Sequence, residues 1–147
     1  MYLRWISYII VTAIINKMTT KNKKNYPTES ELEVLQILWE HGPSSVRKVN
    51  EKLNEKREVG YTTTLKIMQI MTEKGLVTRN TDSRTHVYHS AVKEAETQTS
   101  LLDSFIQKTY RGSAMKLVMQ ALGKEDATTQ ELAELKQIID KIEKKNK

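Results

Sequence analysis

The stretch VGYTTTLKIMQIMTEKGLV, residues 59–77, places three consecutive threonines ahead of a segment with helical periodicity. Its inward positions recur at i, i+3, i+4 and i+7: Thr64, Ile67, Met68 and Met71. The spacing predicts a helix that ends at Lys74 and Gly75. Threonine is disfavoured inside helices but suits the first turn, where its hydroxyl can cap backbone N–H groups or bind an external group that carries oxygen atoms.

Two further helices are predicted upstream of this stretch. Thr28 and Glu31 have the spacing of a capping box, which opens the first of them. Its inward face consists of Leu32, Val34, Leu35, Leu38 and Trp39, and His41-Gly42-Pro43 ends it. A serine, Ser44 or Ser45, caps the second helix, whose inward positions are Val46, Val49 and Leu53.

Downstream, the stretch LVTRNTDSRTHVYH, residues 76–89, predicts a β-hairpin. Two β-prone runs flank the turn formers at residues 80–83, and Arg79 and Arg84 lie near the predicted tip. Three helices followed by a hairpin form a winged helix-turn-helix. In this fold the third helix enters the DNA major groove and the hairpin, or wing, lies along the backbone.

The outward face of the third helix then becomes a candidate DNA-reading surface. Hydroxyls and free N–H groups at a helix start can bind phosphates or base edges, and Lys66 and Gln69 can reach bases. The predicted DNA-binding residues are Thr62, Thr63, Lys66, Gln69, Ile70, Arg79 and Arg84. The alternative is a solvated helix face with a threonine cap.

Composition agrees with a small, helix-rich protein. The chain has 147 residues and a formal net charge of +6, with five glycines, two prolines and no cysteine. The charge favours an anionic partner, either nucleic acid or a membrane surface, although a basic protein without such a partner is an open alternative. The lack of cysteine excludes disulfides and thiolate metal sites, and we expect a cytoplasmic protein.

Several motifs together resemble the penicillinase repressors, the BlaI/MecI/CopY group of bacterial transcriptional regulators. They are TESELEVLQILWEHGPSSVRKVNEKL, YTTTLKIMQIMTEKGLV, the wing, and FIQKTYRGSAMKLVMQAL, so the resemblance covers roughly residues 26–142. The family implies a homodimeric repressor of antibiotic-resistance genes on a palindromic operator, with C-terminal dimerisation helices. It also implies a membrane sensor protease that relieves repression through cleavage in the C-terminal region.

The C-terminal third reads as three amphipathic helices. Residues 93–110, 114–122 and a helix opened by the capping box at Thr128 and Glu131 are separated by Arg111-Gly112-Ser113 and by Gly123. These helices are too short to bury their apolar faces within one chain, so we expect a second copy of the chain to cover those faces. The predicted dimerisation residues are Leu102, Ile106, Leu117, Leu132, Leu135, Ile139 and Ile142. The alternative is that the helices fold back on the winged helix.

Two positions depart from the family pattern. Relatives often carry arginine at the place of Ile70, and the cleaved bond of well-known members is Asn-Phe where this chain has Gln120-Ala121. Operator sequence is therefore not transferable, and possible cleavage is placed at Gln120-Ala121. The copper-responsive branch carries a cysteine cluster, which this chain lacks.

The predicted organisation is an N-terminal extension (1–25), a winged-helix domain (26–91) and a helical dimerisation region (92–147). The apolar run at residues 5–15 is too short to span a bilayer. We expect Met18 to be the start of translation. A membrane-associated extension and a signal peptide are the alternatives.

Other chemistry has little support in the sequence. His86 and His89 are three apart on a predicted strand and point to opposite faces, so we expect no metal site. No phosphate loop or catalytic arrangement is evident, so we expect neither an enzyme nor a cofactor. The alternatives to a repressor are a winged-helix protein-interaction module, which would show an apolar outward face, and a ligand-sensing regulator.

Overall fold

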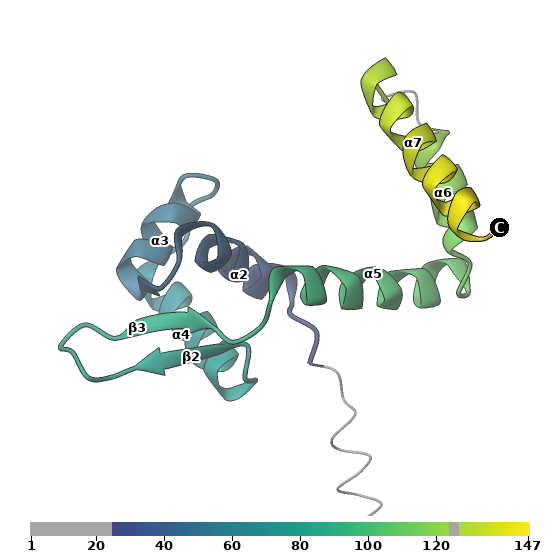
Figure 1. Cartoon of the computed structure of the whole chain (residues 1–147). Coiled ribbons are helices and arrows are strands. Elements are labelled where there is room, and N and C mark those ends of the chain that lie inside the picture. Colours follow the sequence, from purple (N-terminus) through teal and green to yellow (C-terminus); the bar gives the residue numbers. More distant parts are fainter. Residues whose placement is uncertain (1–24, 124–126) are drawn as a thin grey trace, which may run out of the picture. The chain divides into compact units, whose positions relative to one another are not determined.

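The computed structural model describes residues 25–123 and 127–147, in two compact units that divide between Ser100 and Leu101 (Figure 1). The elements are α2 (Glu29–His41), β1 (Ser44–Ser45), α3 (Val46–Asn54), α4 (Tyr61–Glu73), β2 (Val77–Asn80), β3 (Val87–Ser90), α5 (Glu94–Tyr110), α6 (Ala114–Leu122) and α7 (Thr129–Lys145). The expectations for residues 1–17 lie outside the described residues. The predicted domain boundary at residue 91 stays a prediction.

Helices α2, α3 and α4 followed by the β2–β3 hairpin confirm the winged helix-turn-helix. Thr28 and Glu31 form the predicted capping box at the start of α2, and the Ser45 hydroxyl accepts a hydrogen bond from the Lys48 N–H at the start of α3. Gly42 ends α2 with a positive φ of 75°, which a residue without a Cβ adopts at little cost.

The core of the first unit lies among these three helices and the hairpin. Its fully buried side chains come from α2, α3, α4 and both hairpin strands: Val34, Leu35, Val49, Thr64, Met68, Met71, Val77 and Tyr88. Trp39 and Ile67 pack against this cluster while half-buried. The predicted inward faces of α3 and α4 are therefore confirmed. On α2, Val34, Leu35 and Leu38 are buried as predicted, whereas Leu32 is only half-buried and Ile37, which the pattern did not predict, belongs to the core.

The sheet has three antiparallel strands in the order β1-β3-β2, one more than predicted. Ser44 pairs with Tyr88 and Ser45 with Val87, so β1 adds an edge to the hairpin before α3 begins. The expected turn at residues 80–83 is also displaced. Asn80 is the last residue of β2, and the connecting loop covers residues 81–86.

The threonine cap of α4 is not formed. The helix begins at Tyr61 after Gly60, and no side chain caps it. The Thr64 hydroxyl points back into the structure, where it donates to the Gly60 carbonyl. Thr62 and Thr63 are exposed in the first turn.

In the second unit, Arg111 and Gly112 separate α5 from α6, both with positive φ. The Ser113 hydroxyl then caps α6, and Thr128 and Glu131 form the predicted capping box of α7. No helix within residues 25–123 and 127–147 has the length and apolar content needed to cross a membrane.

Candidate nucleic-acid interface

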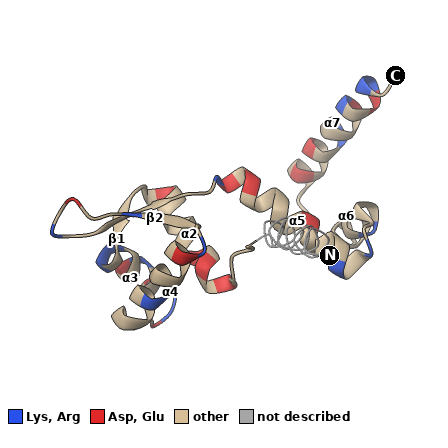
Figure 2. Cartoon of the chain, turned by 90° about the horizontal axis from the view of Figure 1, so that it is seen from below, with Lys and Arg blue, Asp and Glu red and all other residues tan. Residues whose placement is uncertain are grey.

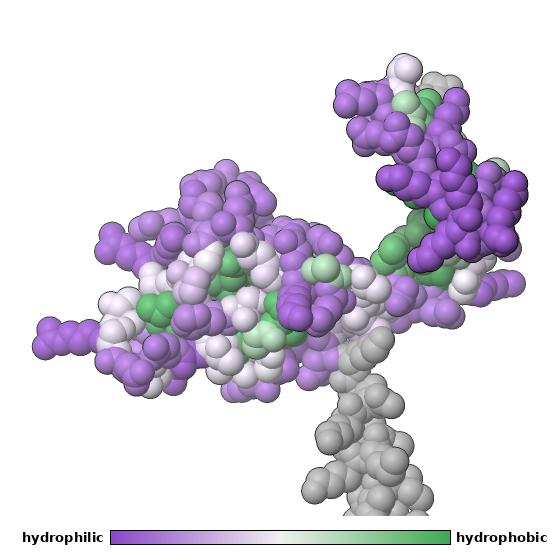
Figure 3. Space-filling model, viewed as in Figure 1, coloured by the Kyte–Doolittle hydropathy of each residue, from purple (hydrophilic) through white to green (hydrophobic). Residues whose placement is uncertain are grey.

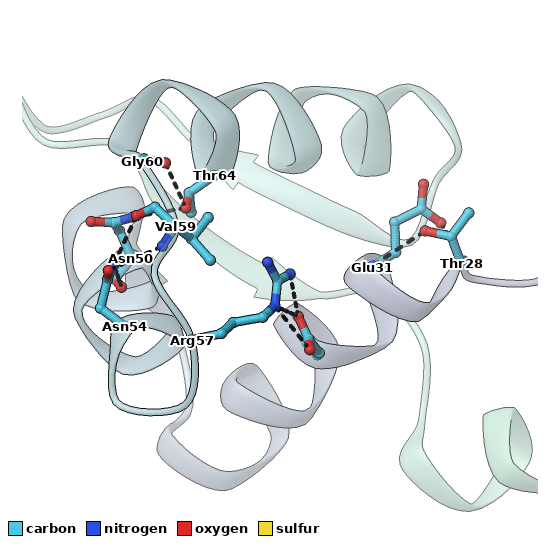
Figure 4. A network of polar contacts seen from close by, with 9 residues as sticks. Thr28, Glu31, Asn50, Asn54, Arg57, Val59, Gly60 and Thr64 are labelled. Atoms are coloured by element: carbon cyan, nitrogen blue, oxygen red, sulfur yellow. Dashed lines mark hydrogen bonds and ion pairs between the residues drawn. The ribbon is translucent and has the colours of Figure 1, made fainter.

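The turn that leads into α4 is held by asparagine side chains of α3 (Figure 4). The Asn50 amide donates to the Val59 carbonyl and to the Thr64 hydroxyl, each at 2.9 Å. Asn54 donates to the same carbonyl at 2.9 Å and accepts from the Val59 N–H at 3.1 Å. Because both amides bind the backbone next to Gly60, they set the position at which α4 starts.

The other end of α4 is tied to α2 by a largely buried ion pair. Lys74 Nζ lies 2.7 Å from Glu31 Oε2, and Glu31 is only 5% exposed. The same carboxylate oxygen accepts the Thr28 N–H of the capping box at 2.9 Å. One buried carboxylate therefore connects the start of α2 to the end of α4, and its removal would leave Lys74 without this partner.

Further contacts from α2 hold the turn after α3 and the base of the wing. Arg57 Nη2 lies 2.7 Å from Glu33 Oε2, and this guanidinium lowers the pKa of the Glu33 carboxyl from its ordinary value. The Trp39 indole N–H donates to the Ser90 hydroxyl and to the Val92 carbonyl, each at 3.0 Å. The wing and the turn are therefore both attached to the same helix.

With its inner face occupied, α4 presents the opposite face to solvent. All five predicted α4 contact residues are exposed there: Thr62, Thr63, Lys66, Gln69 and Ile70. Arg79 on β2 and Arg84 in the wing loop are exposed as well. In Figure 2 the ribbon carries the blue of Lys and Arg on the wing and on α3 and α4.

Two neighbouring grooves bring most of these residues together. The first, of about 490 Å³, lies among α3, α4 and the wing, and Gln69, Arg79 and Arg84 line it. The second, of about 410 Å³, is lined by Lys66, Gln69, Ile70 and Arg79. Gln69 and Arg79 border both grooves, which makes the outer face of α4 continuous with β2. Thr62 and Thr63 line neither groove.

The first groove also contains residues that the sequence reasoning missed. Arg47 in the first turn of α3, Tyr61 at the start of α4 and His86 in the wing loop all line it. Arg47 lies two positions after the capping serine, Ser45, in the first turn of α3. In a helix-turn-helix the first helix of the motif crosses the DNA backbone. Its place at the start of that helix could have identified Arg47 as a candidate DNA contact from the sequence. Among the described residues, no cluster of three or more histidine or acidic side chains could hold a metal ion.

The predicted dimerisation residues lie on all three helices of the second unit. Leu102, Leu132, Ile139 and Ile142 are exposed, whereas Ile106, Leu117 and Leu135 are half-buried within the chain. Figure 3 shows hydrophobic surface over α6 and the adjoining end of α5. Other large apolar residues are exposed in this unit as well: Phe105, Met115, Val118, Met119, Leu122 and Ile138.

The chain matches the model of a protein family described as "Penicillinase repressor" over residues 27–141. It is 28% identical over 120 residues to the methicillin resistance regulatory protein MecI of Mammaliicoccus sciuri, a match that covers 82% of this chain and 98% of the relative. It is 32% identical over 112 residues to the transcriptional regulator BlaI of Mycobacterium tuberculosis (strain CDC 1551 / Oshkosh), covering 71% of this chain and 81% of the relative. A solution structure of Bacillus licheniformis BlaI, in monomeric form in complex with the blaP half-operator, is similar over 47% of this chain and 84% of that chain. Its sequence identity is 22% and the TM-score is 0.42.

Proposed function

Because this chain belongs to the penicillinase repressor family, we propose that it is a transcriptional repressor that binds double-stranded DNA through its winged helix. The observation that carries this proposal is the continuous groove surface in which Lys66 and Gln69 of α4 lie beside Arg79 of β2. These side chains supply cationic groups for phosphates and hydrogen-bond donors for base edges on one face. The relatives suggest genes of the β-lactam-resistance type as its targets.

In this docking mode α4 lies in the major groove and the wing follows the backbone. Lys66 and Gln69 contact base edges, whereas Arg79 and Arg84 contact phosphates. Thr62 and Thr63, in the uncapped first turn of α4, also bind phosphate, because exposed hydroxyls and unpaired N–H groups there suit an anion. Arg47 adds a third arginine, beside Arg79 and Arg84, to the first groove.

The repressor acts as a homodimer on a palindromic operator. Support comes from the second unit, where no described residue is buried and ten large apolar side chains are exposed: Leu102, Phe105, Met115, Val118, Met119, Leu122, Leu132, Ile138, Ile139 and Ile142. An accumulation of exposed apolar side chains of this size is typical of an interface. Two linked winged helices then bind two half-sites with far greater avidity than one.

Repression ends when a protease, directed by a membrane sensor, cuts α6 near Gln120-Ala121. Both residues are exposed, and α6 has nine residues with none buried. A helix this short is marginally stable alone, so it opens readily to the extended form that a protease binds. Opening α6 would also break the hydrogen bond from the Tyr110 hydroxyl to Gln120 Oε1, at 3.0 Å. The cut separates the winged helix from α7.

The cleavage step is tested by immunoblot of native cells during β-lactam exposure. We expect a fragment that ends near Gln120 to appear as the target genes are derepressed. Replacing Gln120 or Ala121 by proline would disrupt helix α6 itself. Ala121→Asp changes the proposed cleavage site without a proline, so it is the better test, and it should delay induction. Derepression with only full-length protein present would eliminate the protease model.

The repressor function itself is tested by genome-wide footprinting with the full-length protein. We expect protection of a small set of palindromic sites that overlap promoters, and loss of protection when Lys66 and Gln69 are both replaced by alanine. Absence of sequence preference would contradict the proposal.

The protein-interaction alternative requires an apolar patch on the outward face of α4. The exposed large hydrophobic residues of α4 are Tyr61 and Ile70, at opposite ends of the helix, with Thr62, Thr63 and Lys66 between them. This polar surface favours DNA, rather than a protein, as the partner of α4.

A further inference from the structure

We propose that Ile70 is a base-reading residue that recognises the 5-methyl group of a thymine in the DNA site. This inference rests on the proposed DNA-binding function and specifies one of its contacts.

Ile70 is an apolar residue in the middle of a polar surface. It is 37% exposed and lines the second groove together with Lys66, Gln69 and Arg79. Lys66 lies four positions before it, so both side chains project from the same side of α4, one turn apart. The two base-reading side chains proposed above, Lys66 and Gln69, therefore lie next to Ile70 in this groove.

A comparison with Ile67 shows that Ile70 lies outside the core. Ile67, three positions earlier, packs against the buried cluster of the first unit. Ile70 is absent from that cluster and from the half-buried residues around it. Exposed apolar area is unfavourable in water, at about 25 cal/mol per Å². Only contact with a partner would cover it.

The chemistry of the major groove identifies that partner. Base edges there present hydrogen-bond donors and acceptors, and the thymine methyl is the apolar group among them. Isoleucine has nothing to donate or accept. Against the other edges it would strip water from polar atoms without replacing the hydrogen bonds, which costs free energy. Against thymine, the methyl groups of isoleucine pack on the 5-methyl group of the base, and both are removed from water. Ile70 thus selects thymine, while Lys66 and Gln69 have the donors for guanine or adenine at neighbouring positions.

The test uses a DNA duplex that wild-type full-length protein selects from a random library. Each thymine of that duplex is replaced singly by deoxyuridine, which removes only the 5-methyl group, and the dissociation constants of wild type and Ile70→Ala are measured. We expect one position in each half-site at which uracil weakens wild-type binding about four-fold, the effect of one buried methyl group. The Ile70→Ala variant should bind the thymine and uracil duplexes equally at that position.

Two control variants separate this contact from general effects on binding. Lys66→Ala should lose affinity yet keep its sensitivity to uracil, because it leaves Ile70 in place. Ile70→Val, which retains a branched side chain, should keep most of that sensitivity. Since Ile70 is exposed and outside the core, we expect all variants to melt cooperatively near the wild-type temperature.

The inference is overturned if wild type binds thymine and uracil duplexes equally at every position, or if Ile70→Ala keeps the wild-type pattern. In both cases a sequence has been selected, so the proposed repressor function stands. If wild type enriches no sequence at all, the proposed function fails and this inference fails with it.

Discussion

Three neighbouring threonines of α4 have different surroundings. Thr64 is fully buried and its hydroxyl is bonded on both sides, to Asn50 as acceptor and to the Gly60 carbonyl as donor. Thr62 and Thr63 are exposed at the start of the helix. Thr64 therefore links α3 to α4, whereas Thr62 and Thr63 are available to a ligand. The difference arises because successive positions along a helix are rotated by about 100°.

Replacing Lys66 or Gln69 by alanine should weaken binding to the selected duplex by about 1–3 kcal/mol each, the usual value of a good base contact. Binding to a scrambled duplex should change much less, because these residues read bases. Fluorescence anisotropy with both duplexes measures the difference. Gln36→Ala, an exposed glutamine on α2, is the matched control and should bind like wild type. Equal losses on both duplexes would place these residues on the DNA backbone instead.

Replacing Arg79 or Arg84 by alanine should weaken binding to both duplexes, because a phosphate contact carries no sequence information. Each replacement should also reduce the slope of log affinity against log salt by about 1, since one fewer counterion is released. Titrations at several salt concentrations measure the slope. Lys136→Ala, which removes an exposed cation of α7, should leave the slope unchanged. A wild-type slope in both arginine variants would remove the wing from the interface.

At the level of elements, periodicity and capping residues predicted most of the fold. The inward faces of α2, α3 and α4 and both capping boxes required only local patterns in the sequence. The missed features depend on contacts distant in sequence. Strand β1 has two residues and exists only because Tyr88 and Val87 pair with it. The start of α4 at Tyr61 is set by Asn50 and Asn54, which no local rule connects to that helix.

The candidate site was predictable to a similar degree. Exposure of Lys66, Gln69 and Ile70 followed from the inward positions of α4, since the remaining positions must face outward. The grooves could not be predicted from the sequence, because they form only when Arg79 of β2 and Arg47 of α3 approach the same side of α4. Such groupings depend on tertiary packing, which periodicity does not describe.

The ion pair between Glu33 of α2 and Arg57 of the following turn should make stability depend on pH. The pKa of Glu33 is lowered in the folded state, so its contribution is fully present above the unfolded value of about 4.3. It is lost as the pH falls through the folded pKa. We expect wild type to lose up to about 1 kcal/mol from this pair on acidification, because the pair is partly exposed.

Urea denaturation between pH 7 and pH 3 measures this loss. Arg57→Gln should be less stable than wild type at pH 7, and the difference should shrink as the pH falls. Arg47→Gln, which breaks an exposed pair with Glu51, should keep the wild-type pH dependence because it leaves Glu33 and Arg57 intact. A constant difference between wild type and Arg57→Gln at all pH values would show that the guanidinium acts through packing alone.

On the scale of the whole molecule, the two units differ in how they bury apolar side chains. The first has a closed core around Leu35, Met68 and Tyr88. The described residues of the second have no buried member, although α6 and α7 carry regular apolar stripes. We expect the first unit to fold unaided, whereas the proposed dimer would cover the apolar stripes of the second.

The dimer is best tested with Ile139→Asp. Ile139 is 52% exposed within the chain, so a carboxylate there disturbs the dimer interface without entering a packed interior. Sedimentation should show a monomer, and affinity for a full palindrome should fall to that for a half-site. Leu135→Asp should also give monomers, but Leu135 is half-buried within its own unit, so it is the less selective variant.

Lys136→Asp, at an exposed polar position of α7, supplies the charge control and should remain dimeric. Wild-type protein that sediments as a monomer at micromolar concentration would refute the dimer.

The separation of the two faces of α4 has a consequence for how such repressors diverge. Thr64, Met68 and Met71 are fixed by the core, whereas Lys66, Gln69 and Ile70 contribute little to it. Surface substitutions of this kind usually change stability by less than about 0.5 kcal/mol. After gene duplication, a copy can therefore acquire new target promoters through changes at a few exposed codons while selection preserves the same scaffold. Relatives with nearly identical cores are then expected to govern unrelated sets of genes.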